Sequence, residues 1–139
     1  MQIRAFEESD TDAVVALWEA AGLVRPWNDP RRDIQRKLAV QRDLFLVTEV
    51  EGAVVATVMA GYDGHRGWVN YLAVAPDLRG RGLARSLMTE VEARLEAAGC
   101  PKLNLQVRTD NEAALGFYRA IGYSVDAAVS LGKRLIPDD

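Results

Sequence analysis

The hydrophobic positions of this chain predict a sheet covered by amphipathic helices. Residues 53–60 are almost entirely apolar, which is typical of a strand buried on both faces of a sheet. Leucine or valine recurs at every fourth position from Leu83 to Leu95, so this segment is expected to form a helix with one buried face. Residues 103–107 then alternate between apolar and polar side chains and predict a further strand.

The same criteria, applied along the whole chain, give the order β-α-α-β-β-β-α-β-α-β-β. Strands are expected at residues 3–6, 44–50, 53–61, 68–74, 103–107, 123–125 and 129–136. Helices are expected within residues 9–22, 29–38, 83–99 and 111–122. Ser9 to Asp12 has the spacing of a capping box, and Asp29 followed by Pro30 is typical of a helix start.

These elements together predict the class and the layers of the fold. A helix lies between the strands at 68–74 and 103–107, which implies a parallel β-α-β crossover. The strands before it follow one another through short turns and are expected to be antiparallel. We therefore expect one domain over residues 1–139, of the α/β or α+β class, with three layers and a mixed, mostly antiparallel sheet.

The composition fits a single soluble domain and excludes several kinds of protein. The net charge is −3 at pH 7, so neither nucleic acid nor a membrane is expected as a partner. Cys100 is the one cysteine and His65 the one histidine, which excludes an internal disulfide and a Cys/His zinc site, and we expect no metal. The N-terminal residues lack the apolar core of a signal peptide, and no apolar run is long enough to span a bilayer. We expect a cytoplasmic protein.

Candidate chemistry begins where the strand ending at Val74 leads through a glycine-containing loop into a helix. The first backbone N–H groups of a helix lack intrahelical partners and carry partial positive charge, which favours an anion. Gly80 and Gly82 have no Cβ, so a phosphate can approach the backbone, and Arg79 and Arg81 add positive charge. The loop therefore predicts a phosphate site, although a tight turn alone would also require glycine.

Two segments resemble the signatures of a known superfamily, the GNAT-type acetyl-CoA-dependent N-acetyltransferases. Arg79 to Ala84 fits the Gln/Arg-x-x-Gly-x-Gly/Ala loop of that family. Asn111 to Tyr123 fits its second signature, in which Asn opens a helix, Tyr follows seven residues later, and Gly with an aromatic residue comes after. The order of elements agrees over nearly the whole chain. Residues 25–30, 61–67 and 130–136 are similar to the bacterial YpeA-type members.

The resemblance implies an acyltransferase that uses acetyl-CoA as its co-substrate. It also implies a V-shaped opening between the strands at 68–74 and 103–107, in which the pantetheine arm would lie. The residues that the resemblance assigns to acetyl-CoA are Leu72, Ala73, Val74, Arg79, Gly80, Arg81, Gly82, Leu83, Ala84, Arg85, Asn111 and Tyr118.

Acetyl transfer to an amine needs a proton donor for the leaving thiolate and a proton acceptor for the attacking amine. Tyr118 is the expected donor, and packing of its ring into the core is the alternative role. Glu49 is the expected acceptor, directly or through a water, because a carboxylate is unusual on its otherwise apolar strand face. Asp63 and His65, in a turn, are weaker candidates. A backbone N–H within residues 72–74 is expected to stabilise the oxyanion.

The acceptor is expected to be a primary amine, selected by loops beside the opening. The residues assigned to this role are Trp27, Asn28, Tyr62, Asp63 and Arg66. Trp27 has an alternative role as a core anchor, which its size favours. A small molecule or an amino acid is the expected acceptor. The alternatives are a peptide or protein N-terminus or lysine, or a non-catalytic module that binds acetyl-CoA; a homodimer is left open.

Overall fold

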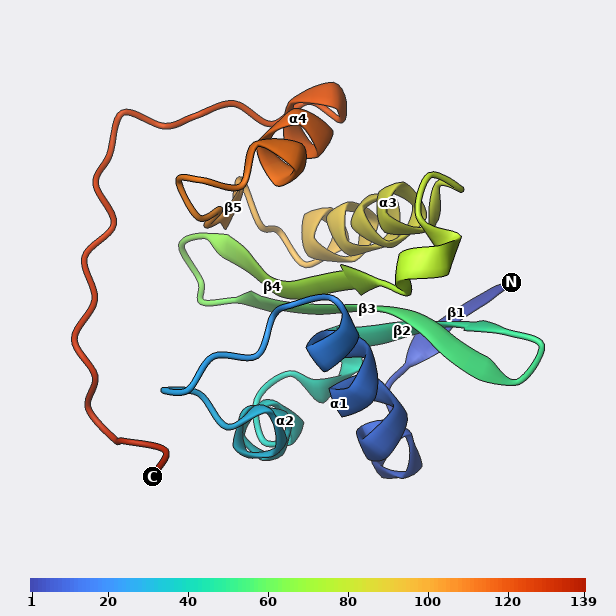
Figure 1. The fold of residues 1–139 in the computed structure, drawn as a ribbon. Helices are drawn as coiled ribbons and strands as arrows, with labels where there is room; N and C mark the ends of the chain where they lie inside the picture. The colour runs from blue at the N-terminus through green and yellow to red at the C-terminus, as the bar shows by residue number, and fades with distance from the viewer.

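The computed structural model describes residues 1–139 and contains a five-stranded sheet with helices on both faces (Figure 1). The strands are β1 (Gln2–Ala5), β2 (Phe45–Val50), β3 (Ala53–Tyr62), β4 (Gly67–Val74) and β5 (Leu103–Leu105). They follow the sheet in their order along the chain, and each neighbouring pair is antiparallel except β4 and β5, which are parallel. The mixed sheet and its single parallel crossover confirm the predicted fold class.

Four α-helices and three single 3-10 turns complete the described chain. The helices are α1 (Thr11–Ala20), α2 (Pro30–Leu38), α3 (Leu83–Ala97) and α4 (Glu112–Ala120). The turns are η1 (Glu8–Asp10), η2 (Arg42–Leu44) and η3 (Pro76–Leu78). Helices α1 and α2 cover one face of the sheet, whereas α3 and α4 lie on the other (Figure 1). No helix is both long enough and apolar enough to cross a membrane.

Each face of the sheet has its own hydrophobic core, because successive residues of a strand point to opposite faces. In β2, Leu46 packs into the core beneath α3, whereas its neighbours Phe45 and Val47 pack into the core beneath α1 and α2. All three side chains are fully buried. β3 is the third of the five strands, as its two apolar faces predict.

The sheet opens at the end of its parallel pair. β4 and β5 are paired only from Gly67 with Leu103 to Val69 with Leu105, whereas β4 continues to Val74. Beyond Val69, the edge of β4 that faces β5 therefore has no strand beside it. This is the V-shaped opening that the family resemblance implies, and it lies between the two helical layers.

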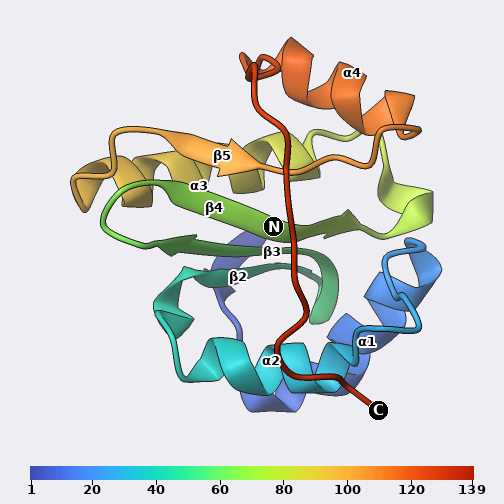
Figure 2. The same ribbon diagram turned by 90° about the vertical axis from the view of Figure 1, so that its left-hand side faces the viewer.

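The chain after α4 differs from the prediction. Residues 123–125 and 129–136 were expected to be strands, but no regular element follows α4 (Figure 2). Strand-like alternation stabilises a strand only where another strand supplies hydrogen bonds, and no strand pairs with this segment. It runs instead as an extended segment from α4 past the sheet to α2, with Leu131 91% exposed. We call residues 123–139 the C-terminal segment.

The two predicted helix starts have different outcomes. Asp29 caps α2 as expected: its Oδ1 accepts hydrogen bonds from the backbone N–H groups of Arg31 and Arg32, and Pro30 is the first helical residue. The capping box expected from Ser9 to Asp12 is absent. A capping box is present instead at the preceding turn η1, between Glu7 and Asp10. The side chain of Asp10 accepts a hydrogen bond from the backbone N–H of Glu7 at 2.8 Å.

Candidate functional site

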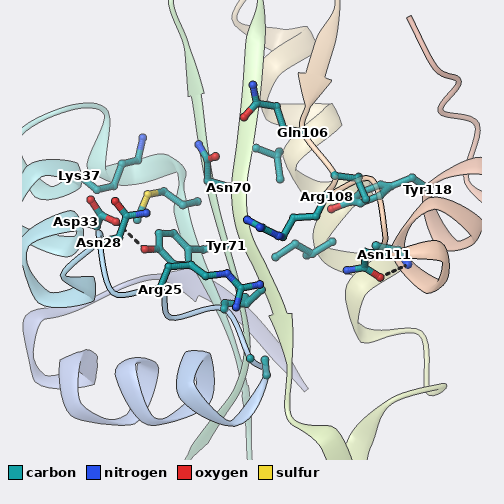
Figure 3. Close-up of a pocket in the computed structure, with 18 of the residues that line it drawn as sticks. Arg25, Asn28, Asp33, Lys37, Asn70, Tyr71, Gln106, Arg108, Asn111 and Tyr118 are labelled. Atoms are coloured by element: carbon teal, nitrogen blue, oxygen red, sulfur yellow. Dashed lines mark hydrogen bonds between the residues drawn. The ribbon is translucent and has the colours of Figure 1, made fainter. Parts of the chain in front are cut away.

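A cavity of about 710 Å³ occupies the opening between β4 and β5 (Figure 3). Its walls come from segments that are far apart in the sequence: the α1–α2 connection with α2, Met59 of β3, the middle of β4, and the chain from the end of β5 into α4. The polar and charged residues that line it are Arg25, Asn28, Asp33, Arg36, Lys37, Asn70, Tyr71, Gln106, Arg108, Asn111 and Tyr118. We call it the central cavity.

A β-bulge shapes the wall that β4 contributes. Thr57 of β3 is paired with Ala73 and Met59 with Asn70, so β4 contains one more residue than β3 between these pairs. Within the bulge, Tyr71 has φ 53°, a left-handed conformation that is uncommon for a side chain with a Cβ. Such a backbone persists only where the surrounding structure holds it.

A chain of side-chain contacts holds this bulge in place. The indole Nε1–H of the fully buried Trp18 donates to Thr57 Oγ1 at 2.9 Å, and this hydroxyl donates to the carbonyl oxygen of Tyr71 at 2.9 Å. The rings of Trp18 and Tyr71 are stacked, with centroids 3.8 Å apart. The Tyr71 hydroxyl donates to Asp33 Oδ2 at 2.6 Å, and both burial and this carboxylate raise the pKa of Tyr71. Helices α1 and α2 therefore fix the position of the bulge.

Beyond the bulge, β4 presents unpaired backbone groups to the opening. The N–H of Ala75 donates to Val55 and so points toward β3. Because successive N–H groups of a strand point to opposite sides, those of Leu72 and Val74 point toward the β5 side, where no strand is present. Leu72 and Val74 are among the residues that the family resemblance assigns to acetyl-CoA. Between them, the side chain of Ala73 packs into the hydrophobic core beneath α1.

The opposite wall carries Asn111 and Tyr118. Asn111 caps α4: its Oδ1 accepts from the backbone N–H of Ala114 at 3.0 Å, which leaves its amide NH₂ as a donor in the cavity wall (Figure 3). The Tyr118 ring packs edge-on against Phe117 and Tyr123, and its hydroxyl has no hydrogen-bond partner in the protein. Burial raises the pKa of Tyr118 to about 12, so this hydroxyl remains protonated at physiological pH.

The loop from Arg79 to Arg85, which we call the arginine–glycine loop, leads from β4 into α3. Gly80 and Gly82 have φ 78° and 80°, and a Cβ built on either would meet no atom within 4 Å. No backbone N–H from Arg79 to Arg85 donates to an acceptor within the protein, and its arginine side chains form no ion pair. The loop is therefore an open set of backbone donors at a helix N-terminus, the arrangement that binds phosphate.

The C-terminal segment passes in front of the sheet on its way from α4 to α2 (Figure 2). It makes hydrogen bonds to three cavity-lining residues: Ser130 with Gln106, Arg134 with Asn28 at 2.5 Å, and Asp138 with Arg36 at 2.5 Å. The Asp138 carboxylate also accepts from the backbone N–H of Asp29, and these donors hold the pKa of Asp138 well below its usual range. The segment is thus tied to residues of two cavity walls, although none of its own residues lines the cavity.

Glu49, the expected proton acceptor, does not line the central cavity. Met59 of the cavity wall is paired with Phe45, and Glu49 lies four residues further along β2, roughly 13 Å away along the strand. Its Oε1 accepts hydrogen bonds from Arg4 at 3.1 and 3.3 Å, and Arg4 also binds Asp10. This ion-pair cluster explains why a carboxylate occurs on an otherwise apolar strand face.

Four of the five residues assigned to the acceptor also lie elsewhere. Asn28 lines the central cavity, but Tyr62, Asp63 and Arg66 lie at the β3–β4 turn and do not. Asp63 accepts from the backbone N–H groups of His65 and Arg66, which lowers the pKa of Asp63 and explains its presence in that turn. Trp27 is 55% exposed, so the prediction that it is a core anchor is wrong, and it is not a cavity residue either.

Several cavity residues had no signal in the sequence. The bulge at Tyr71 has no glycine to mark it, and Asp33 reads as an ordinary charge on an exposed helix face. Arg25 was noticed only as part of a resemblance, and Arg108 follows a strand whose alternation ends there. What these residues share is their place in the cavity wall, and the cavity forms only when segments distant in the sequence pack together.

Comparison with known proteins adds the family context. The sequence model of the acetyltransferase (GNAT) family matches residues 11–123. An acetyltransferase of Yersinia enterocolitica is 54% identical over 138 residues, covering 99% of this chain and 98% of the relative. A PaiA N-acetyltransferase from Thermoplasma acidophilum, solved in complex with coenzyme A, has a similar fold, with a TM-score of 0.81 and 15% identity over 92% of each chain. The ribosomal-protein-S18-alanine N-acetyltransferase from Escherichia coli has a TM-score of 0.73 at 24% identity, covering 87% of this chain and 76% of its own.

Proposed function

The chain belongs to the acetyltransferase (GNAT) family and is an acyltransferase, and on this basis we propose that it moves an acetyl group from acetyl-CoA to a primary amine. The acceptor is a small molecule or an amino acid whose amine attacks the thioester directly. The observation that carries the proposal is the continuity of two features: the free backbone donors of the arginine–glycine loop and the unpaired edge of β4. Together they offer a phosphate site followed by an extended slot.

The residues present fit the chemistry of acetyl-CoA. The N–H groups from Arg79 to Arg85 would hold the pyrophosphate, since none has a partner in the protein and nothing fills the space above Gly80 and Gly82. Leu72 and Val74 would pair with the amides of the pantetheine arm, as a neighbouring strand would. The free NH₂ of Asn111 would donate to the arm from the opposite wall. When bound, acetyl-CoA supplies the activated acetyl thioester.

Three groups of the protein would assist the transfer. The amine nitrogen forms a bond to the carbonyl carbon, the bond from that carbon to sulfur breaks, and the sulfur takes a proton. A backbone N–H of the 72–74 stretch donates to the developing oxyanion, which needs no movement of a side chain. The Tyr118 hydroxyl donates the proton that the sulfur takes, because it is protonated, unpartnered and exposed to the cavity.

The attacking amine must also lose a proton, and we assign this role to Asp33 in place of Glu49. Asp33 is the one carboxylate in the wall of the central cavity. Its Oδ1 accepts from Arg36 at 3.1 Å and its Oδ2 from the Tyr71 hydroxyl at 2.6 Å, so both oxygens are fixed in direction. A carboxylate held in this way can bind the ammonium and accept its proton, directly or through a water.

Calorimetric titration with acetyl-CoA, followed by a panel of primary amines, tests the proposal. We expect micromolar binding of acetyl-CoA, release of free thiol with at least one amine, and an acetylated product by mass spectrometry. Binding without turnover across the panel would favour a non-catalytic module. Absence of binding by the wild-type protein would overturn the proposal as a whole.

A further inference from the structure

The central cavity has a charge opposite to that of the whole chain. The protein carries a net charge of −3, yet the charged residues lining the cavity are the basic Arg25, Arg36, Lys37 and Arg108 and the single acid Asp33. A concave site lined by one sign of charge concentrates ligands of the other sign. The acceptor of the proposed reaction must nevertheless carry an amine, which is usually cationic. The basic lining therefore requires a separate explanation.

Two of the four basic residues have partners in the protein. Arg36 forms ion pairs with Asp33 at 3.1 Å and Asp138 at 2.5 Å. Lys37 is buried, its ammonium donates to the carbonyl oxygen of Ala60, and burial lowers the pKa of Lys37. Both side chains therefore have structural roles in joining α2 to its neighbours.

Arg25 and Arg108 are different, because neither side chain forms a hydrogen bond or an ion pair within the protein. Arg25 comes from the α1–α2 connection and Arg108 from the chain after β5, so they belong to opposite walls. Figure 3 shows both guanidinium ends reaching toward the middle of the cavity. Guanidinium groups match carboxylates and phosphates through paired hydrogen bonds, and two unpaired ones repel each other unless an anion lies between them.

The phosphates of acetyl-CoA do not account for these two arginines. The arginine–glycine loop supplies the phosphate site, and none of its residues lines the central cavity. The part of the carrier that would reach the cavity, with its thioester and amides, is uncharged. An anionic group between Arg25 and Arg108 must therefore belong to the acceptor.

We infer that the acceptor is a small molecule that carries an anionic group, a carboxylate or a phosphate, in addition to its amine. Arg25 and Arg108 bind the anionic group, and Asp33 faces the amine. This inference rests on the proposed acetyl transfer and adds the class of acceptor. The C-terminal segment favours a small acceptor, because it is hydrogen-bonded to Gln106, Asn28 and Arg36 of the cavity wall and reduces the space there for a long peptide.

Acceptors that differ only in charge test the inference. Steady-state kcat/KM is measured with the twenty amino acids, their carboxamides and a series of aminoalkyl phosphates, at saturating acetyl-CoA. We expect an anionic acceptor to be preferred over its uncharged counterpart by about 10- to 100-fold, the effect of a charge-assisted pair of hydrogen bonds. The amino acid and phosphate series distinguish a carboxylate from a phosphate.

Arg25→Gln and Arg108→Gln complete the test. Each is expected to lower kcat/KM for the anionic acceptor by about 10-fold or more while leaving the uncharged counterpart and the KM for acetyl-CoA unchanged. If the arginine had a purely structural role, its replacement would lower kcat/KM equally for the anionic and the uncharged acceptor. Arg42→Gln is the matched control, because Arg42 is exposed, forms no side-chain hydrogen bond and lies outside the cavity.

The outcomes separate this inference from the proposed function. If acetyl-CoA binds but only uncharged amines or peptides are acetylated, or no anionic amine of the panel is acetylated, the inference is overturned and acetyl-CoA use stands. If acetyl-CoA does not bind, the proposed function fails first.

Discussion

The arginine–glycine loop and the central cavity are neighbouring parts of one site, but they are built in different ways. The loop is a continuous run from Arg79 to Arg85, and its donors are backbone N–H groups without partners in the protein. The cavity is lined by side chains from four distant segments, and most of its polar groups already have a partner. A backbone site depends on local conformation, whereas a side-chain site depends on the packing of the whole domain. Substitutions in the two regions should therefore have different effects.

The largest expected effect is at the backbone site. Gly82→Glu places a carboxylate among the donors that would hold phosphate, and like-charge juxtaposition costs several kcal/mol. We expect the Kd for acetyl-CoA to rise about 1,000-fold, measured by calorimetry. Gly52→Glu is the matched control: Gly52 also has φ 80° and open space around it, but it lies in the β2–β3 turn. Both variants should lose similar stability, about 1 kcal/mol from the left-handed backbone, and only Gly82→Glu should lose binding. Equal loss of binding in both variants would contradict the assignment.

The next effect concerns a side chain of the cavity wall. Tyr118→Phe should lower kcat about 100-fold, the usual size of a general-acid effect, without changing acetyl-CoA binding. Because the pKa of Tyr118 is raised to about 12, the hydroxyl remains protonated as the pH rises, and kcat should show no loss from its ionisation below about pH 11. Tyr123→Phe is the control, since the Tyr123 hydroxyl bonds to Glu92 outside the cavity. If Tyr118→Phe retained the wild-type kcat at saturating substrates, Tyr118 would not be the proton donor.

A smaller effect is expected at Asp33. Asp33→Asn retains an oxygen that can accept from Tyr71 but loses the proton acceptor. At pH 9 a primary amine with a pKa of about 10.4 is neutral in only about 4% of molecules, so kcat/KM should fall by at most about 25-fold. The loss of kcat/KM relative to the wild type should decrease to about twofold near pH 10.4, where half of the amine is neutral. Asp12→Asn, at an exposed carboxylate that pairs with Arg31, should have no such pH-dependent effect. A deficit that is constant with pH would argue against a proton-transfer role.

The smallest effect on turnover concerns the C-terminal segment. The partners of Asp138 hold its pKa below the ordinary value, so its contribution to holding the segment is complete above about pH 4 and is lost as the pH falls through the lowered pKa. The segment should therefore remain attached at pH 5. Asp138→Asn should release it at neutral pH, with faster tryptic cleavage at Lys133 and Arg134 and a few-fold higher acceptor KM. Unchanged cleavage in this variant would show that other contacts hold the segment. Asp139→Asn is the adjacent control.

The same contrast explains what the sequence could predict. Local signals identified the loop and the parallel crossover, because glycine spacing and hydrophobic period act over a few residues, whereas the opening was implied by the family resemblance. Asn111 and Tyr118 were assigned through the second signature of the family that the chain resembles, which covers one helix and its N-cap. These features need no knowledge of what packs against them.

Where the structure differs from the expectation, the physical reasons are not local. Glu49 was selected because a carboxylate is unusual among apolar neighbours, but the same pattern results from an ion pair with Arg4, a residue 45 positions away. Alternation at residues 129–136 could not reveal that no strand lies beside them. The left-handed backbone at Tyr71 depends on Trp18 and Thr57, so its own residue type gives no warning.

The stack of Trp18 on Tyr71 also gives the protein an optical reporter. Trp18 is fully buried and its ring contacts the residue that forms the bulge, whereas Trp27 and Trp68 are 55% and 39% exposed. Replacing those two exposed indoles with phenylalanine would leave Trp18 as the single tryptophan, directly behind the reaction site. Its emission would follow any shift of the bulge as ligands enter, without a label and at submicromolar protein concentrations.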